Sequence, residues 1–203
     1  MSVQNYIYLS IQLLACCAAI YYWRHYRQTP MWIFLPFLIY TFCNEILAMA
    51  LSSKYPVRIL YNLYILISFG VYMYWFDKLL KFRFWKWIIW ILFAAAFIYD
   101  ALTINLIKNL IKTTVNVQAV LLLIFSLVFF VNLLKSNEVI HYQRLPEFWI
   151  VCGLLMFYIG FVPLSLYLGQ GYNILHIYYI AIIILNLLLY GGYIIGFYVS
   201  GRR

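Results

Sequence analysis

Residues 38–54 read LIYTFCNEILAMALSSK, a run in which nearly every side chain suits a lipid environment except Asn44 and Glu45. The whole chain has the same character. Its 203 residues are 67% hydrophobic and only 9% charged, and the mean hydropathy is +0.93. Soluble domains carry roughly 25% charged residues. The composition therefore indicates a membrane protein that crosses the bilayer several times.

A helix that crosses a bilayer needs about 20 mostly apolar residues. Seven runs of this kind follow one another along the chain, separated by short polar connectors. They cover residues 5–23, 31–51, 59–76, 85–103, 115–134, 148–168 and 174–198. We predict an all-α fold in which residues 1–203 form one domain, a bundle of seven transmembrane helices. The segment 105–113, NLIKNLIKT, is expected to form a short interfacial helix.

Lysine and arginine are unevenly distributed between the connectors. Ten of the 14 lie in the odd-numbered connectors and at the C-terminus, and four lie in the even-numbered connectors. Because basic residues favour the cytoplasmic side, we predict an outside N-terminus and a cytoplasmic C-terminus. All seven tryptophans fall at predicted cytoplasmic ends, as an interfacial belt would. Orientation signals thus account for the net charge of +9, and we expect no nucleic-acid partner.

Two stretches suggest an internal repeat. RILYNLYILI at 58–67 aligns with NILHIYYIAI at 173–182. The implied arrangement is a 3+1+3 parallel repeat, of a kind that occurs in some transporters. Apolar helices also resemble one another by chance, so both explanations stay open.

Most intramembrane polar side chains share one depth, the predicted outer half. A charged group there costs roughly 2.5–3.5 kcal/mol, so Glu45 should face the bundle interior. These side chains either form hydrogen bonds between helices or line an outward-opening pocket for a small ligand or a proton. We favour the pocket, because six spans contribute polar groups at this depth. Its predicted ligand-binding residues are Glu45, Gln12, Asn62, Gln118, His176, Asp100 and, nearer the middle of the membrane, Asn186. Solvation at a span end equally explains Asp100, and an interfacial or hydrogen-bonded position equally explains His176.

Helix periodicity predicts which faces point inward. The small and polar face of the second span carries Thr41, Glu45, Ala48 and Ser52, and the sixth span offers Gly153 and Gly160 for close helix packing.

The sequence lacks the residues that several seven-helix chemistries require. No span core carries a lysine for a retinal Schiff base, and neither an HExxH motif nor a glycine-rich phosphate loop occurs. The four cysteines lie in apolar runs without zinc-ligand spacing and are expected to be small buried apolar residues. We therefore expect no cofactor and no metal, and nothing in the sequence argues for catalytic residues.

Four phrases carry a resemblance that covers most of the chain, although its motifs are loose. They are NEILAMAL at 44–51, YNLYILISFGVYMYWF at 61–76, FWIVCGLLMFYIG at 148–160 and LNLLLYGGYIIGFY at 185–198. They resemble a group of small, uncharacterised seven-helix inner-membrane proteins common in Bacteroidetes. The resemblance implies the fold and a bacterial inner-membrane location, and it implies no activity.

Three classes of function fit these observations. The first is a receptor-like sensor that binds a small molecule from the outer side and engages a cytoplasmic or membrane protein partner. Its cytoplasmic basic residues would be Lys78, Lys81, Arg83 and Lys86, which orientation alone explains equally well. The second is a small-solute or proton-coupled transporter. The third is a structural subunit of a membrane complex. A transporter should show a polar path across the whole bundle, so the outer-half polarity favours sensing or binding.

Overall fold

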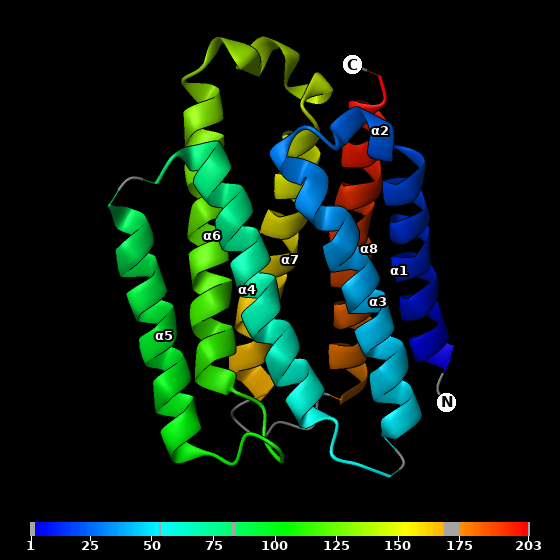
Figure 1. Cartoon of the computed structure of the whole chain (residues 1–203), viewed down its shortest axis with the longest axis vertical. Helices are drawn as coiled ribbons and strands as arrows, with labels where there is room; N and C mark the ends of the chain where they lie inside the picture. Colours follow the sequence, from blue (N-terminus) through cyan, green and yellow to red (C-terminus); the bar gives the residue numbers. More distant parts are fainter. Residues whose placement is uncertain (1–2, 53, 83, 169–174, 203) are drawn as a thin grey trace.

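The computed structural model describes residues 3–52, 54–82, 84–168 and 175–202, with side chains outside the description at 3–5, 137–139, 166–168 and 175–179. The described chain is helical, without a strand (Figure 1). Its seven long helices are α1 (Val3–Tyr21), α3 (Phe34–Leu51), α4 (Arg58–Leu80), α5 (Trp85–Thr103), α6 (Lys112–Leu134), α7 (Pro146–Leu168) and α8 (Leu175–Ser200). Short helical segments are α2 (Trp23–Tyr26), η1 (Pro30–Ile33) and η2 (Asn137–Arg144). Each predicted apolar run corresponds to one long helix.

Six of these segments are long and apolar enough to cross a membrane. They are Pro30–Leu51, Arg58–Leu80, Trp85–Thr103, Lys112–Leu134, Pro146–Ser165 and Ile180–Ser200, and α1 adds a shorter apolar stretch, Tyr6–Tyr21. Large apolar side chains cover much of the outer surface. Leu102 and Ile91, for example, are 82% and 66% exposed. The protein is thus a multi-pass helical membrane protein whose surface is suited to lipid contact.

Six of the long helices form a closed ring. Around it, α8 packs on α1, α1 on α3, α3 on α4, α4 on α6, α6 on α7, and α7 on α8. Helix α5 stands outside this ring and packs mainly on α6 (Figure 1). It also contacts α4, where the ring of Phe69 on α4 stacks on the ring of Phe93 on α5 with the centroids 3.7 Å apart. The ring encloses the space in which the candidate site lies.

Glycines allow α7 and α8 to pack closely. A Cβ atom on Gly153 would lie 3.0 Å from the carbonyl oxygen of Leu188 and 3.2 Å from the Cα atom of Gly192. A Cβ atom on Gly160 would meet a methyl group of Leu185 at 2.5 Å. Small residues let helix backbones approach in this way. The predicted close backbone approach is confirmed at Gly153, with Gly192 as its partner on α8, whereas at Gly160 the three nearest atoms belong to the Leu185 side chain.

Buried aromatic side chains fill the bundle toward the end where α8 terminates. We call this cluster the aromatic plug. Phe34 lies at its centre, with its ring centroid 4.8 Å from that of Trp75 and 5.1 Å from that of Tyr193. The other members are Tyr72, Phe76 and Phe125, and all six side chains are at most 3% exposed. The plug closes the interior of the bundle on this side.

Three sequence expectations differ from the structure. Segment 105–113 forms turns followed by the start of α6 at Lys112, not an interfacial helix, because its backbone is held by a side chain of α4 described below. Trp75 is fully buried in the plug and does not belong to an interfacial belt. Cys16 is buried, but Cys17 and Cys43 are exposed on the bundle surface, because they lie on the outer faces of their helices.

Candidate functional site

A cavity of about 610 Å³ lies inside the helix ring, at the end opposite to the aromatic plug. Helices α1, α4, α6, α7 and α8 line it, together with Leu110 from the connector between α5 and α6. Its walls are mainly aromatic. They carry the six tyrosines Tyr8, Tyr61, Tyr64, Tyr72, Tyr158 and Tyr190 and the two phenylalanines Phe157 and Phe161. Rings with hydroxyl groups give this space an apolar surface and several hydrogen-bonding groups.

Two of the predicted ligand-binding residues, Gln118 and Asn186, lie in the cavity wall. The Gln118 Nε2 atom donates to the Ser68 hydroxyl at 2.9 Å, while its buried Oε1 atom has no hydrogen-bond partner among the described residues. Asn186 is 8% exposed, and its amide nitrogen donates to the Ile182 carbonyl at 2.8 Å. A buried acceptor without a donor costs about 1–3 kcal/mol. A donor from a bound molecule or water would remove this cost at Gln118.

Gln12 lies next to the cavity, behind Tyr190. Its Nε2 atom donates to the Tyr190 hydroxyl at 3.1 Å, and its Oε1 atom is buried without a partner among the described residues. The Tyr8 hydroxyl lies within interaction range of both side chains. Gln12 therefore holds the tyrosine wall in place, one layer behind the cavity surface.

Glu45 lies beside the rim of the cavity. Its carboxyl lies near the hydroxyl groups of Tyr61, Tyr8 and Tyr64 and interacts with them electrostatically, and all three tyrosines line the cavity. The buried polar residues of α3 are Thr41 and Asn44, and Glu45 is only partly buried. The inward face of α3 is thus turned slightly from the predicted one, which placed Glu45 at its centre and included the exposed Ser52.

The polar atoms of the Asn62 side chain form hydrogen bonds within the protein. Its Nδ2 atom donates to the carbonyl oxygens of Leu106 at 2.8 Å and Asn109 at 2.9 Å, and its Oδ1 atom accepts from the backbone N–H of Ile111 at 3.2 Å. One side chain of α4 therefore fixes the connector between α5 and α6. This set of bonds also explains why the connector forms turns in place of the predicted helix.

Asp100 likewise has a structural partner. Its Oδ2 atom accepts hydrogen bonds at 2.8 Å from both the backbone N–H and the hydroxyl of Thr114, in the first turn of α6. A carboxylate at a helix N-terminus interacts favourably with the unpaired N–H groups there. Asp100 lines a separate recess of about 370 Å³ formed by the ends of α5 and α6, not the cavity inside the ring.

The side chains of His176 and Tyr179 lie outside the described residues, so the predicted role of His176 stays a prediction. The structure adds site residues that the sequence did not single out. Tyr61 and Tyr64, which the sequence predicts as possible walls of the pocket, line the cavity. Arg58 was counted as an orientation signal, yet it also lies in the cavity wall. The available signal was the coincidence of tyrosines with the polar residues at one depth.

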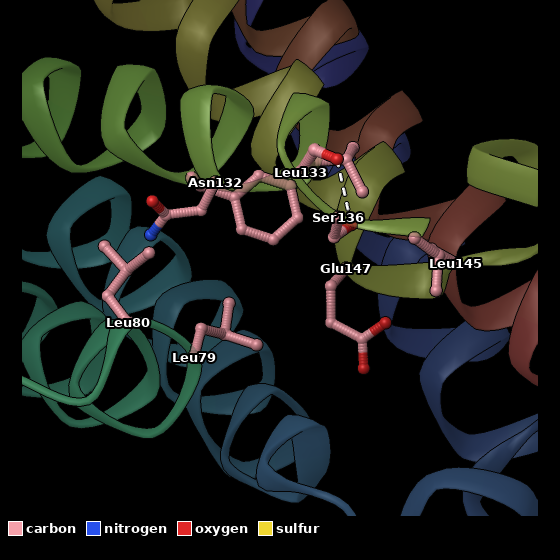
Figure 2. Close-up of a pocket in the computed structure, with 8 residues that line it drawn as sticks. Leu79, Leu80, Asn132, Leu133, Ser136, Leu145 and Glu147 are labelled. Carbon is pink, nitrogen blue, oxygen red and sulfur yellow. Dashed lines mark hydrogen bonds between the residues drawn. The ribbon is translucent and has the colours of Figure 1, made fainter. Parts of the chain in front are cut away.

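A second recess, of about 350 Å³, lies at the other end of the bundle (Figure 2). Leu79 and Leu80 of α4 face Asn132 and Leu133 of α6 there, and Glu147 of α7 is its one charged lining residue. The Ser136 hydroxyl donates to the Leu133 carbonyl at 2.9 Å. The Phe76 and Phe125 rings, with centroids 5.5 Å apart, belong to the plug on the same two helices between this recess and the cavity.

No group of three or more potential metal ligands occurs among the described residues. No protein-family model, no curated protein and no solved structure matches the chain.

Proposed function

We propose that this protein is a receptor-like membrane protein that binds a small, mostly apolar molecule in the cavity inside its helix ring. The observation that carries the proposal is the cavity itself, about 610 Å³ in volume and walled by tyrosines with Ser68, Gln118 and Asn186 among them. Ligand pockets typically measure about 300–1,000 Å³ and combine apolar walls with a few polar groups. The cavity has this size and this mixture.

The proposal includes seven membrane spans with the cavity toward the outside. Helix α1 has 19 residues, which corresponds to about 28 Å of helix and nearly the thickness of a hydrocarbon core. The basic connectors predicted to be cytoplasmic lie at the end of the bundle where α8 terminates, opposite to the cavity. This distribution supports the outside N-terminus. A bacterial inner membrane is the location that the resemblance implies.

Sensing fits the closed interior better than transport does. The aromatic plug lies directly below the cavity, where Tyr72 is both a wall residue and a plug member. A ligand held above a closed plug affects the cytoplasmic end only through shifts of the helices. The basic residues Lys78, Lys81 and Lys86 around the connector from α4 to α5 are the proposed contact for a signalling partner.

A small-solute or proton-coupled transporter is the second candidate. The recess in Figure 2 favours it, because cavity and recess lie along the same helices α4, α6 and α7. Six ring helices with α5 outside them also suit a 3+1+3 parallel repeat. Transport would require the plug to open between Phe76 and Phe125.

The binding proposal is tested with indole, which has an apolar body and one N–H donor. Val115→Trp would fill the cavity, whereas Val120→Trp adds the same bulk to the exposed face of the same helix, where Val120 is 46% exposed. A ligand at 100 times its Kd stabilises the folded state by about 2.7 kcal/mol. We expect indole to raise the melting temperature of the wild type and Val120→Trp but not of Val115→Trp. Equal shifts in all three, or none, would contradict the proposal.

A further inference from the structure

Two opposite charges lie at the rim of the cavity, Arg58 in its wall and Glu45 behind the wall residue Tyr61. Arg58 and Tyr61 lie one turn apart on α4 and both line the cavity, while Glu45 approaches the Tyr61 hydroxyl from α3. The Tyr61 hydroxyl interacts electrostatically with both charged groups. Among the described residues, neither Glu45 nor Arg58 belongs to an ion pair. The two charges are therefore not neutralised by a direct ion pair with each other, and both act on the Tyr61 hydroxyl.

A charged ligand group near Tyr61 interacts with both of these charges, directly with Arg58 and at longer range with Glu45. An anion alone would be attracted by Arg58 and repelled by Glu45, and a cation alone would experience the reverse. A molecule that carries both charges close together satisfies both sites. Charge-assisted hydrogen bonds of this kind are roughly twice as strong as neutral ones.

The cavity beyond the rim has a different character. Its remaining wall residues carry no charge, and tyrosine and phenylalanine rings make up half of the wall. From Arg58 to Ser68, whose hydroxyl accepts from Gln118, the helix axis rises by about 15 Å. An apolar or aromatic group that extends inward from a charged end would occupy this depth.

We propose that the cavity takes a zwitterion of the amino-acid type, with its carboxylate at Arg58, its ammonium group at the Glu45 side of Tyr61, and an apolar or aromatic side chain among the tyrosines. This inference rests on the proposed binding function and specifies its ligand class. Glu45 is not a wall residue, so the ammonium group lies at Tyr61 and interacts with the carboxylate behind it. In this arrangement Glu45, the acidic residue within the apolar run 38–54, contributes to ligand binding.

Four tryptophan derivatives test the proposal, because they share one aromatic body and differ in charge. They are tryptophan, a zwitterion; N-acetyltryptophan, an anion; tryptophanamide, a cation; and N-acetyltryptophanamide, which is neutral. Calorimetric titration of the purified protein in detergent micelles would give their affinities. We expect tryptophan to bind about tenfold more tightly than either singly charged derivative, as one charge-assisted contact implies.

Substitutions assign each charge to its site. Arg58→Gln should weaken binding of tryptophan and N-acetyltryptophan about tenfold, and it should not weaken tryptophanamide, because it removes a charge that repels this cation. Glu45→Gln should weaken tryptophan and tryptophanamide about tenfold, and it should not weaken the anion N-acetyltryptophan. Lys54→Gln is the control, since Lys54 is an exposed cation at the same end and outside the cavity wall. Variants that leave the ranking unchanged would overturn the inference.

The outcomes separate this inference from the binding proposal. If the neutral derivative binds as tightly as tryptophan, the zwitterion inference fails while small-molecule binding stands. If neither indole nor any of the four derivatives binds, both fail.

Discussion

The hydroxyl groups of Tyr72 on α4 and Tyr193 on α8 meet at 2.7 Å in the interior of the bundle. Tyr72 is a wall residue of the cavity, and both tyrosines belong to the aromatic plug. This bond therefore joins opposite sides of the helix ring at the floor of the cavity. It marks the level at which the open interior ends and the closed interior begins.

The effects of removing the Tyr72 and Tyr193 hydroxyl groups on stability should be energetically coupled. Either phenylalanine substitution leaves the other hydroxyl buried without its partner, which we expect to lower the free energy of unfolding by about 1–3 kcal/mol. The double substitution removes both hydroxyls and should cost less than the sum of the two. Unfolding of the four proteins in mixed detergent micelles measures this coupling. Strictly additive effects would show that the two hydroxyls do not interact.

Close packing of α7 and α8 should depend on Gly192 and not on its neighbour Gly191. A Cβ atom at Gly192 would lie 2.7 Å from the Trp149 carbonyl oxygen and 3.0 Å from the Gly153 Cα atom, whereas one at Gly191 meets nothing within 4 Å. Gly192→Ala must push two backbones apart, and overpacking of this kind costs about 1–3 kcal/mol. Gly191→Ala should be neutral or slightly stabilising, because alanine favours helix. Thermal unfolding compares the two, and equal effects would contradict the packing account.

The Asp100 carboxylate should stabilise the start of α6. Asp100→Ala removes both hydrogen bonds to Thr114, and bonds to a charged group contribute about 1.5–3 kcal/mol each. We expect a loss of about 2–4 kcal/mol in the free energy of unfolding. Asp77→Ala, on the partly buried Asp77 of α4, is the matched control and should have a small effect. A loss no larger than that of the control would refute the clamp.

Asn62 should protect the connector between α5 and α6 from hydrogen exchange. In the structure its Oδ1 atom accepts from the Ile111 N–H, so Asn62→Leu should speed exchange of this amide. Asn116→Leu replaces another amide side chain, which contacts Ser165, and should leave Ile111 protected. Hydrogen-exchange mass spectrometry on peptides that cover residues 104–112 provides the measurement. Unchanged protection in Asn62→Leu would show that the connector is held by other contacts.

The length of the apolar runs was sufficient to predict the long helices. Seven apolar runs became seven long helices, and one of them, 85–103, has the predicted bounds. The small side chain of Gly153 also predicted a close helix contact there, although the sequence did not identify α8 as the partner. These features depend on local sequence, and the sequence contains the required information.

The site was predictable by depth but not by partner. Gln118 and Asn62 have the same predicted depth, yet Gln118 lies in the cavity wall while Asn62 forms hydrogen bonds with three backbone groups of a connector. That difference depends on the path of residues 105–111, which no helical pattern encodes. Arg58 illustrates the same limit, because a positive charge at a helix end fits an orientation signal and a cavity wall equally well.

The accessibility of residue 186 tests the central claim, an outward-facing cavity that accepts small molecules, most directly. Asn186 is 8% exposed but lies in the cavity wall, whereas Leu187 is 49% exposed on the surface that faces lipid. Each is changed to cysteine in a protein whose native cysteines are replaced, and intact cells are treated with a charged, membrane-impermeant thiol reagent. The account predicts rapid labelling of Asn186→Cys, slower when a bound ligand fills the cavity, and little labelling of Leu187→Cys. An unreactive Asn186→Cys would contradict the claim.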